Sequence, residues 1–228
     1  MNKRIVSILA VGLILVPFLL VGAVSAKTLK IGSLSPLTGP YASDGTDIKN
    51  GVLTAISEFE EQGGMPGYDK IELYAQDTAC DPRQAVAAAN KLVNLEVAGA
   101  IGAYCSSSTI PASNVLDEEE VIMITPASTH QDVTERGLPY MFRMCGRDDA
   151  QAPAAARFIK EALGAETIFI VDDKTTYSQG LADGVKKAAK ELGIKVLGHE
   201  HVNQGDKDFS AVLTRAKQET PDVFYMSL

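Results

Sequence analysis

The sequence lacks the short motifs that carry most catalytic chemistry. None of its 228 residues falls in a GxSxG, GxGxxG, HExxH or P-loop pattern, the signatures of a hydrolase nucleophile, a dinucleotide site, a zinc protease and a phosphate-binding loop. No CxxC pair is present, so the three cysteines suggest neither a zinc site nor a thioredoxin-like centre. We therefore expect no enzyme, no cofactor and no metal site.

Positive charge is also scarce. The chain has 21 Lys and Arg against 29 Asp and Glu, a formal net charge of −8. An acidic chain of this kind repels phosphate backbones, so we expect no nucleic acid among its partners.

The N-terminus has the pattern of a secretory signal. Lys3 and Arg4 precede an apolar run at residues 5–24, and small residues follow at 24–26. We expect cleavage after residue 26 and a periplasmic protein, without a lipoprotein anchor because no cysteine is near the cut. A retained transmembrane anchor is the alternative, since the apolar run is nearly long enough to span a bilayer. Export would place the cysteines in an oxidising compartment, where one pair could form a disulfide.

The rest of the chain alternates between strand-like and helix-like segments. Ile48, Val52 and Phe59, for example, share one face of a 3.6-residue period. Regular β-α alternation predicts an α/β fold of parallel sheets flanked by helices, here in two Rossmann-like lobes at residues 27–147 and 148–228. We interpret the sequence as incomplete at its C-terminus. Strands are expected at 29–34, 71–75, 97–103, 121–124, 140–144, 167–171, 194–197 and 223–226, and helices at 48–59, from Pro82 onward, and at 111–118, 150–163, 181–192 and 209–218.

Three polar loops follow strands, at residues 35–41, 104–109 and 125–129. Ligands of open parallel sheets bind at the carboxyl ends of the strands. The second loop runs into a helix start, whose free N–H groups and dipole favour a carboxylate. Each loop alone is better explained by helix capping, but three at equivalent strand ends favour a binding site.

Two smaller patterns have local interpretations. Asp81, Pro82 and Gln84 match the N-cap, the first helical position and the capping-box position of a helix. His199 and His201 point to one strand face, which permits a metal pair, but we interpret them as a solvated strand edge because no third ligand is near in sequence.

Six short stretches are distinctive when taken together. They are GSLSPLTGP at 32–40, ACDPRQAVAAAN at 79–90, CSSSTIPAS at 105–113, ITPAST at 124–129, TYSQGLA at 176–182 and KDFSA at 207–211. In these stretches the chain resembles the periplasmic leucine/isoleucine/valine-binding proteins of the type I solute-binding fold. The stretches follow the family's order and extend over essentially the whole chain after residue 26.

The resemblance implies a ligand site. Ser106 matches a serine that binds the ligand carboxylate, and Ala127 matches a position whose carbonyl accepts from the ligand ammonium. Thr129 matches a threonine that contacts both groups, with Ser128 in the same loop. Tyr177 matches a tyrosine of the second lobe that closes over the ligand.

The resemblance also implies a disulfide between Cys80 and Cys105, which would contribute roughly 3–4 kcal/mol and brace the loop of Ser106. Cys145 has no counterpart. Asp44 stands where some members place an aromatic residue against the ligand side chain. The family's acidic residue for the ammonium group lies further along than this chain extends.

These implications favour the solute-binding component of an ABC importer. It would bind a branched-chain or related hydrophobic amino acid between two lobes, as a monomer, and dock on an inner-membrane permease. The alternative is a sensory receptor of the same fold for an amide or an aromatic acid. A third hypothesis, an exported hydrolase, would use one of the serines at 106–108 with His130 as base.

Overall fold

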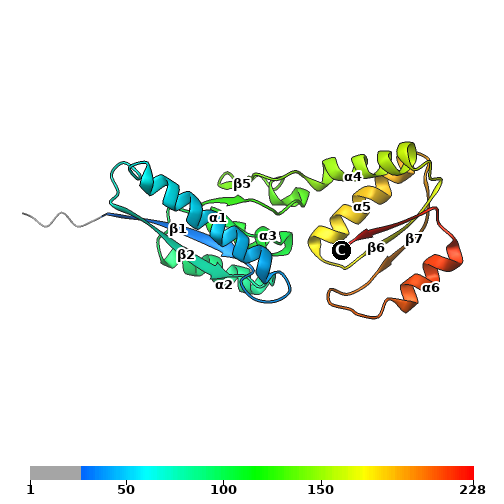
Figure 1. The fold of residues 1–228 in the computed structure, drawn as a ribbon, viewed down its shortest axis with the longest axis horizontal. Coiled ribbons are helices and arrows are strands. Elements are labelled where there is room, and N and C mark those ends of the chain that lie inside the picture. Colours follow the sequence, from blue (N-terminus) through cyan, green and yellow to red (C-terminus); the bar gives the residue numbers. More distant parts are fainter. Residues whose placement is uncertain (1–26) are drawn as a thin grey trace, which may run out of the picture.

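Two parallel sheets organise the protein. A computed structural model describes residues 27–228, so the expected signal sequence lies outside the described residues. All strand pairs in these residues are parallel, in a five-stranded sheet of order β2-β1-β3-β4-β5 and a three-stranded sheet of order β7-β6-β8. The sheets form two lobes that lie end to end (Figure 1). The prediction of an α/β fold with parallel sheets is confirmed.

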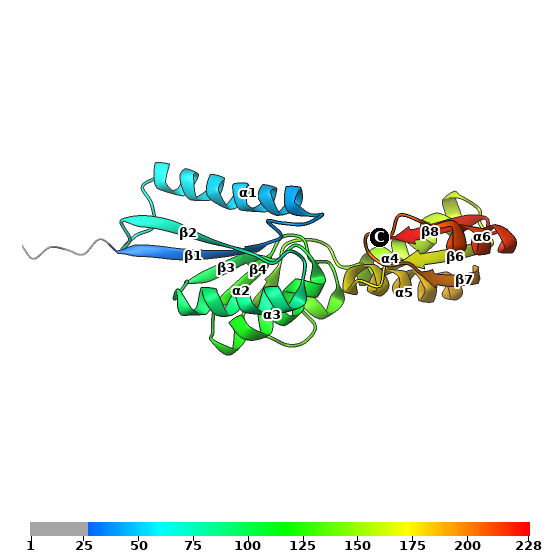
Figure 2. The ribbon, with the colours of Figure 1, turned by 90° about the horizontal axis from the view of Figure 1, so that it is seen from below.

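The first lobe has helices on both faces of its sheet. Helix α1 covers one face, and α2 and α3 cover the other (Figure 2). The strands are β1 (Thr28–Ser35), β2 (Lys70–Asp77), β3 (Gly99–Gly102), β4 (Ile122–Thr125) and β5 (Met141–Arg143), and the helices are α1 (Ala42–Glu61), α2 (Pro82–Asn94), α3 (Ser106–Glu118) and the short 3-10 turn η1 (Gln131–Val133).

The second lobe repeats this arrangement on a smaller scale. Its helices α4 and α5 lie on one face of the sheet and α6 on the other (Figure 1). The elements are α4 (Asp148–Arg157), the π-helical segment η2 (Phe158–Ala162), β6 (Thr167–Asp172), α5 (Thr176–Glu191), β7 (Lys195–His201), α6 (Ser210–Glu219) and β8 (Val223–Ser227).

Alternation along the central strand of the second lobe explains its two-sided core. Ile168 and Ile170 are fully buried on the α4–α5 face. Phe169 and Val171 are buried on the α6 face, where the ring of Phe169 stacks on Phe224 with centroids 5.9 Å apart. A strand buried on both faces is nearly continuously apolar, as this one is.

In the first lobe, the core lies between the sheet and helices α2 and α3, around Leu34, Leu92, Leu116 and Met123. Strand β4 is buried on one face only, because Ile122 is 43% and Ile124 36% exposed while Met123 is buried. No helix among residues 27–228 is long and apolar enough to cross a membrane.

Local sequence signals explain some boundaries and miss others. Asp81 caps α2 as expected, accepting from the N–H groups of Arg83 and Gln84 at 2.9 and 2.8 Å. The reciprocal half of the capping box does not form, because the Asp81 N–H donates to the Thr78 carbonyl at 2.8 Å, while the Gln84 amide donates to the Asp77 carbonyl. Helix α3 begins at Ser106 rather than at 111, with Pro111 inside it.

Candidate functional site

A cleft of about 690 Å³ lies between the two lobes. It collects loops at the carboxyl ends of strands from both sheets, which is where parallel α/β folds bind ligands. The polar and aromatic residues that line it are Tyr41, Asp81, Tyr104, Ser106, Ser107, Thr129, Asp173, Lys174, Thr175, Thr176, Tyr177 and Gln204, together with Ala127 and Cys80.

Ser106 is the first residue of α3, at the base of the cleft. Its side chain is buried, and its hydroxyl accepts from the backbone N–H of His130 at 3.3 Å. The first N–H groups of a helix have no intrahelical partner and carry the positive end of its dipole. The start of α3 therefore provides a position suited to a carboxylate.

The loop after β4 is shaped by Thr125. Its buried hydroxyl donates to the Ala103 carbonyl at 2.7 Å and accepts from the Ser128 N–H at 3.1 Å. Thr129 follows this turn. Its hydroxyl is buried, has the carboxyl of Asp148 as a polar neighbour, and makes no hydrogen bond in the described residues. A buried hydroxyl on a cleft wall, without a partner, is available to a ligand.

Ser128 lies behind the cleft wall, outside the lining residues. Its hydroxyl is 2.5 Å from that of Thr109 and 2.9 Å from the Tyr104 carbonyl. The Ser128 carbonyl accepts from Arg143 at 3.2 Å and from the Cys145 thiol at 3.5 Å. These contacts fix the loop that carries Ala127 and Thr129.

The second lobe contributes the start of α5. The hydroxyl of Thr175 caps this helix by accepting from the Ser178 N–H, and it donates to Asp173 at 2.7 Å. Tyr177 follows in the first turn and lines the cleft. Burial raises the pKa of the Tyr177 phenol, so it is a neutral donor at physiological pH.

Several lining residues were not selected from the sequence. Tyr41 and Tyr104 form an aromatic pair with ring centroids 5.6 Å apart. Gln204, from the second lobe, donates to the Tyr41 hydroxyl at 2.8 Å and so links the lobes. Both tyrosines stand at the edges of the polar loops noted above, so the sequence offered a reason to select them. No feature of the sequence around Gln204 pointed to the cleft. Asp44 is exposed on α1.

The predicted disulfide is present. Cys80 and Cys105 are bonded, with Cα atoms 5.5 Å apart, and Cys145 is the free cysteine. The bond joins the loop after β2 to the residue that precedes Ser106. It therefore holds two cleft walls together covalently.

Asp148 is a buried ionisable residue whose charge is only partly compensated. It is 3% exposed, and neither carboxylate oxygen makes a hydrogen bond in the described residues. Burial raises the pKa of its carboxyl above the ordinary value, and the neighbouring Thr129 hydroxyl, His130 and Arg143 offset only part of this effect. Because the folded state then binds more protons than the unfolded state between the two pKa values, stability falls as the pH rises through that window.

We expect Asp148→Asn to raise the melting temperature of the ligand-free protein at pH 7 by about 2–4 °C, the shift that roughly 1 kcal/mol produces in a chain of this size. The gain should shrink as the pH falls through the window and vanish about one unit below the ordinary Asp pKa of about 3.9, where the wild-type carboxyl is protonated in both states. Thermal denaturation between about pH 3 and pH 7 measures both. The neighbouring Asp149→Asn is the control of opposite sign, since the hydrogen bonds from Arg147 lower the pKa of Asp149. An unchanged or lower melting temperature for Asp148→Asn at pH 7 would contradict this account.

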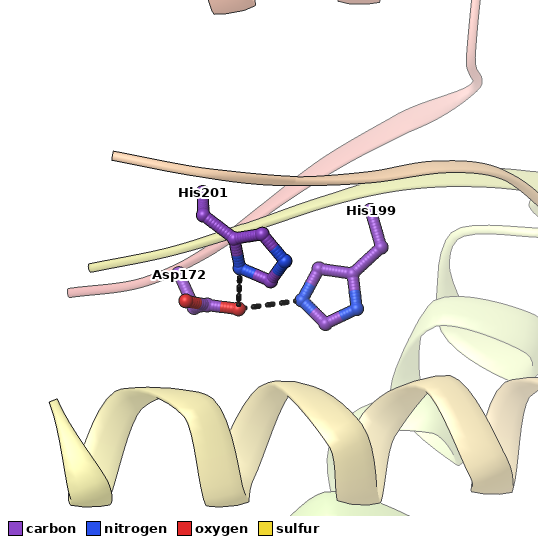
Figure 3. Close-up of side chains that lie close together, drawn as sticks. All are labelled: Asp172, His199 and His201. Carbon is purple, nitrogen blue, oxygen red and sulfur yellow. Dashed lines mark hydrogen bonds and ion pairs between the residues drawn. The ribbon is translucent and has the colours of Figure 1, made fainter. Parts of the chain in front are cut away.

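A cluster outside the cleft corrects the interpretation of His199 and His201. They are not a solvated strand edge without a third ligand: Asp172 Oδ2 lies 2.6 Å from His199 Nε2 and 2.7 Å from His201 Nδ1 (Figure 3). Burial alone would raise the pKa of Asp172, but hydrogen bonds from His201, the Lys174 N–H and His199 lower it. The buried carboxylate is thus ionised at neutral pH.

Comparison with known proteins supports a common origin. Residues 28–228 match the family model described as periplasmic binding protein. The chain is 46% identical over 196 residues to an amino acid binding protein of Pseudomonas aeruginosa, covering 86% of this chain and 52% of that protein. It is 43% identical over 196 residues to a leucine-, isoleucine-, valine-, threonine- and alanine-binding protein of the same organism, with the same coverage.

Solved structures of similar proteins have the same fold. A leucine-binding protein from Thermotoga maritima superposes with a TM-score of 0.80 at 32% identity, covering 86% of this chain and 55% of that one. A branched-chain amino acid transporter substrate-binding protein from Streptococcus pneumoniae, in complex with isoleucine, gives 0.74 at 28% identity, covering 84% and 54%. The chain spans about half the length of the curated relatives it matches.

Proposed function

The chain belongs to the periplasmic binding protein family, and from that premise we propose that its cleft captures a branched-chain or related hydrophobic amino acid for an ABC importer. One observation carries the proposal: the buried, unpartnered hydroxyl of Thr129 shares a cleft with the N-terminus of α3 at Ser106. A hydroxyl that can accept from an ammonium and a helix start that can donate to a carboxylate, both on one wall, suit the two charged ends of an amino acid.

In this proposal the ligand carboxylate binds at Ser106, where the serine hydroxyl and the first N–H groups of α3 donate to it. The ligand ammonium donates to the carbonyl of Ala127 and to the hydroxyl of Thr129. Ser128 acts indirectly by holding this loop. The aromatic rings of Tyr41 and Tyr104 provide apolar surface for the ligand side chain.

Closure of the two lobes, at residues 27–147 and 148–228, would bring Tyr177 over the bound ligand. Hinge closure of two domains around a ligand is a common binding motion. The proposed protein is a monomer that is exported to the periplasm by cleavage of residues 1–26 and that docks, closed, on an inner-membrane permease.

We infer binding rather than catalysis. His130 contacts Ser106 through its backbone N–H, while its ring Nδ1 accepts from the Asp132 N–H at 3.1 Å. A serine nucleophile needs the ring nitrogen of its base within hydrogen-bond reach.

Ser106→Ala is expected to weaken leucine binding by about tenfold or more, because a lost hydrogen bond to a charged ligand group is worth about 1.5 kcal/mol or more. Isothermal titration of the full chain, stripped of ligand by unfolding and refolding, measures this. Ser108→Ala is the matched control, since Ser108 is in the same helix but outside the cleft lining, with its hydroxyl buried and unpartnered. Equal affinities for the two variants would remove Ser106 from the site.

The rival is a receptor for an aromatic acid. A chain that binds 4-hydroxybenzoate in the same titration but no amino acid would overturn the proposed ligand class.

A further inference from the structure

The second lobe holds a convergent set of ligand-type side chains that the proposed amino acid site does not use. Asp172 is the last residue of β6, and His199 and His201 are on the neighbouring strand β7. In the parallel register, Asp172 pairs with His201 and Ile170 pairs with His199. All three side chains therefore leave the sheet on one face, towards α5 (Figure 3).

The donor atoms converge on one point. His199 Nε2 and His201 Nδ1 both face Asp172 Oδ2, and one ligand atom from each residue lies within 4.8 Å of the others. The imidazole rings are tilted against each other, with centroids 4.8 Å apart. Each ring thus directs a nitrogen at the same carboxylate oxygen, which is the approach that two imidazoles take to a shared cation.

The environment favours a positive charge at this point. The Asp172 side chain is fully buried and the His199 side chain is only 7% exposed. One oxygen of the Asp172 carboxylate, Oδ1, accepts from the Lys174 N–H. The other, Oδ2, is contacted by the two histidines. A buried carboxylate is stable only when paired, hydrogen-bonded or bound to a metal.

We propose that Asp172, His199 and His201 bind a divalent transition metal ion of the Zn²⁺ class. Two imidazole nitrogens and one carboxylate oxygen suit Zn²⁺, Ni²⁺ or Co²⁺, whereas Mg²⁺ and Ca²⁺ prefer oxygen ligands alone. Three protein ligands leave a fourth position for water in a tetrahedral site. This inference is independent of the proposed amino acid site.

Metal binding needs a small rearrangement of the cluster. Bonds of about 2.0–2.1 Å in tetrahedral geometry separate ligand atoms by about 3.3 Å, so the two Asp–His contacts of 2.6 and 2.7 Å must lengthen, while the ligand atoms that now lie up to 4.8 Å apart must approach. His201 can supply this movement, because its side chain is 40% exposed at the end of β7. Its exposure also gives the ion a route in from solvent.

A carboxylate lies near the outer ring nitrogen of His199, beyond hydrogen-bond distance in this arrangement but on an exposed side chain that can turn towards it. A ring that binds through Nε2 carries its proton on Nδ1, and carboxylates commonly accept that proton in a hydrogen bond. Asp183 Oδ1 lies 3.8 Å from His199 Nδ1. Lys186 Nζ is nearer, at 3.3 Å, and must turn away when the metal binds. Its long side chain starts from the middle of α5 and allows this.

The test is titration of Zn²⁺ into the untagged full chain by calorimetry, with Co²⁺ absorption as a spectroscopic readout. The free thiol is removed beforehand by Cys145→Ser, because thiolates also bind these metals. We expect one Zn²⁺ per chain, a visible Co²⁺ band, and no response to Mg²⁺. His201→Asn should weaken Zn²⁺ binding at least tenfold, while circular dichroism shows the fold intact.

The chain provides its own matched control. Its three histidines are His130, His199 and His201, so His130→Asn removes an imidazole from outside the cluster and should leave Zn²⁺ affinity unchanged. Absence of Zn²⁺ binding, equal loss in both variants, or comparable binding of Mg²⁺ would overturn the proposal and leave the cluster as a purely hydrogen-bonded one.

Discussion

Replacing both Cys80 and Cys105 by serine is expected to lower the free energy of unfolding by about 3–4 kcal/mol, the largest single effect we predict. The bond closes a loop with a sequence separation of 25 residues. Without it the unfolded chain gains the conformational freedom of that loop. Urea denaturation followed by circular dichroism, under oxidising conditions, measures the change.

The same change should also weaken ligand binding, since Cys105 precedes Ser106 at the start of α3. Cys145→Ser is the control for replacing a cysteine without breaking a bond; its thiol makes one 3.5 Å contact, with the Ser128 carbonyl. A double serine variant as stable as the Cys145→Ser protein would show that the bond contributes nothing.

Gly45→Ala is expected to destabilise the protein by about 3 kcal/mol or more, although alanine normally favours helices. Gly45 is buried in the first turn of α1, and a Cβ there would lie 2.0 Å from the carbonyl oxygen of Pro36 and 2.6 Å from its carbonyl carbon. Neither contact can be relieved by a side-chain rotation, because both atoms are backbone. The loop at 35–41 must therefore move, and with it Tyr41 on the cleft wall.

Gly51→Ala in the same helix is the matched comparison. A Cβ at Gly51 meets nothing within 4 Å, and the residue is exposed. This variant should gain roughly 0.5–1 kcal/mol, because alanine loses less backbone entropy than glycine on entering a helix. Chemical denaturation of the two variants side by side measures a difference of opposite sign. If Gly45→Ala were the more stable of the two, the close approach of α1 to Pro36 would be wrong.

The elements that the sequence predicted correctly are those determined by local chemistry. Apolar periodicity fixes the strands and helices, because each must bury one or both faces. Asp81 caps α2 because its side chain reaches two N–H groups that would otherwise be free. The start of α3 was missed because three serines and Pro111 are typical of a loop, whereas the helix begins at Ser106 and contains Pro111.

The site was harder to predict because it depends on residues distant in sequence. The polar loops were identifiable one by one, and the family resemblance selected Ser106, Ala127, Thr129 and Tyr177, which the structure brings to one cleft.

Tertiary arrangement, not local sequence, brings the other partners together. The contact between Gln204 and Tyr41 depends on how the lobes lie. The position of Asp172 between two histidines depends on the register of β6 and β7. Neither contact can be predicted from the residues that are adjacent in sequence.

We propose that the cleft recognises both charged ends of a hydrophobic amino acid. Calorimetric titration of the ligand-stripped chain tests this with L-leucine and two analogues: 4-methylpentanoate, which lacks the ammonium group, and leucinamide, which lacks the carboxylate. We expect saturable binding of L-leucine and a loss of at least tenfold for each analogue, since each leaves one group of the site unpaired. Analogue affinities equal to that of L-leucine, or no binding of any branched-chain amino acid, would contradict it.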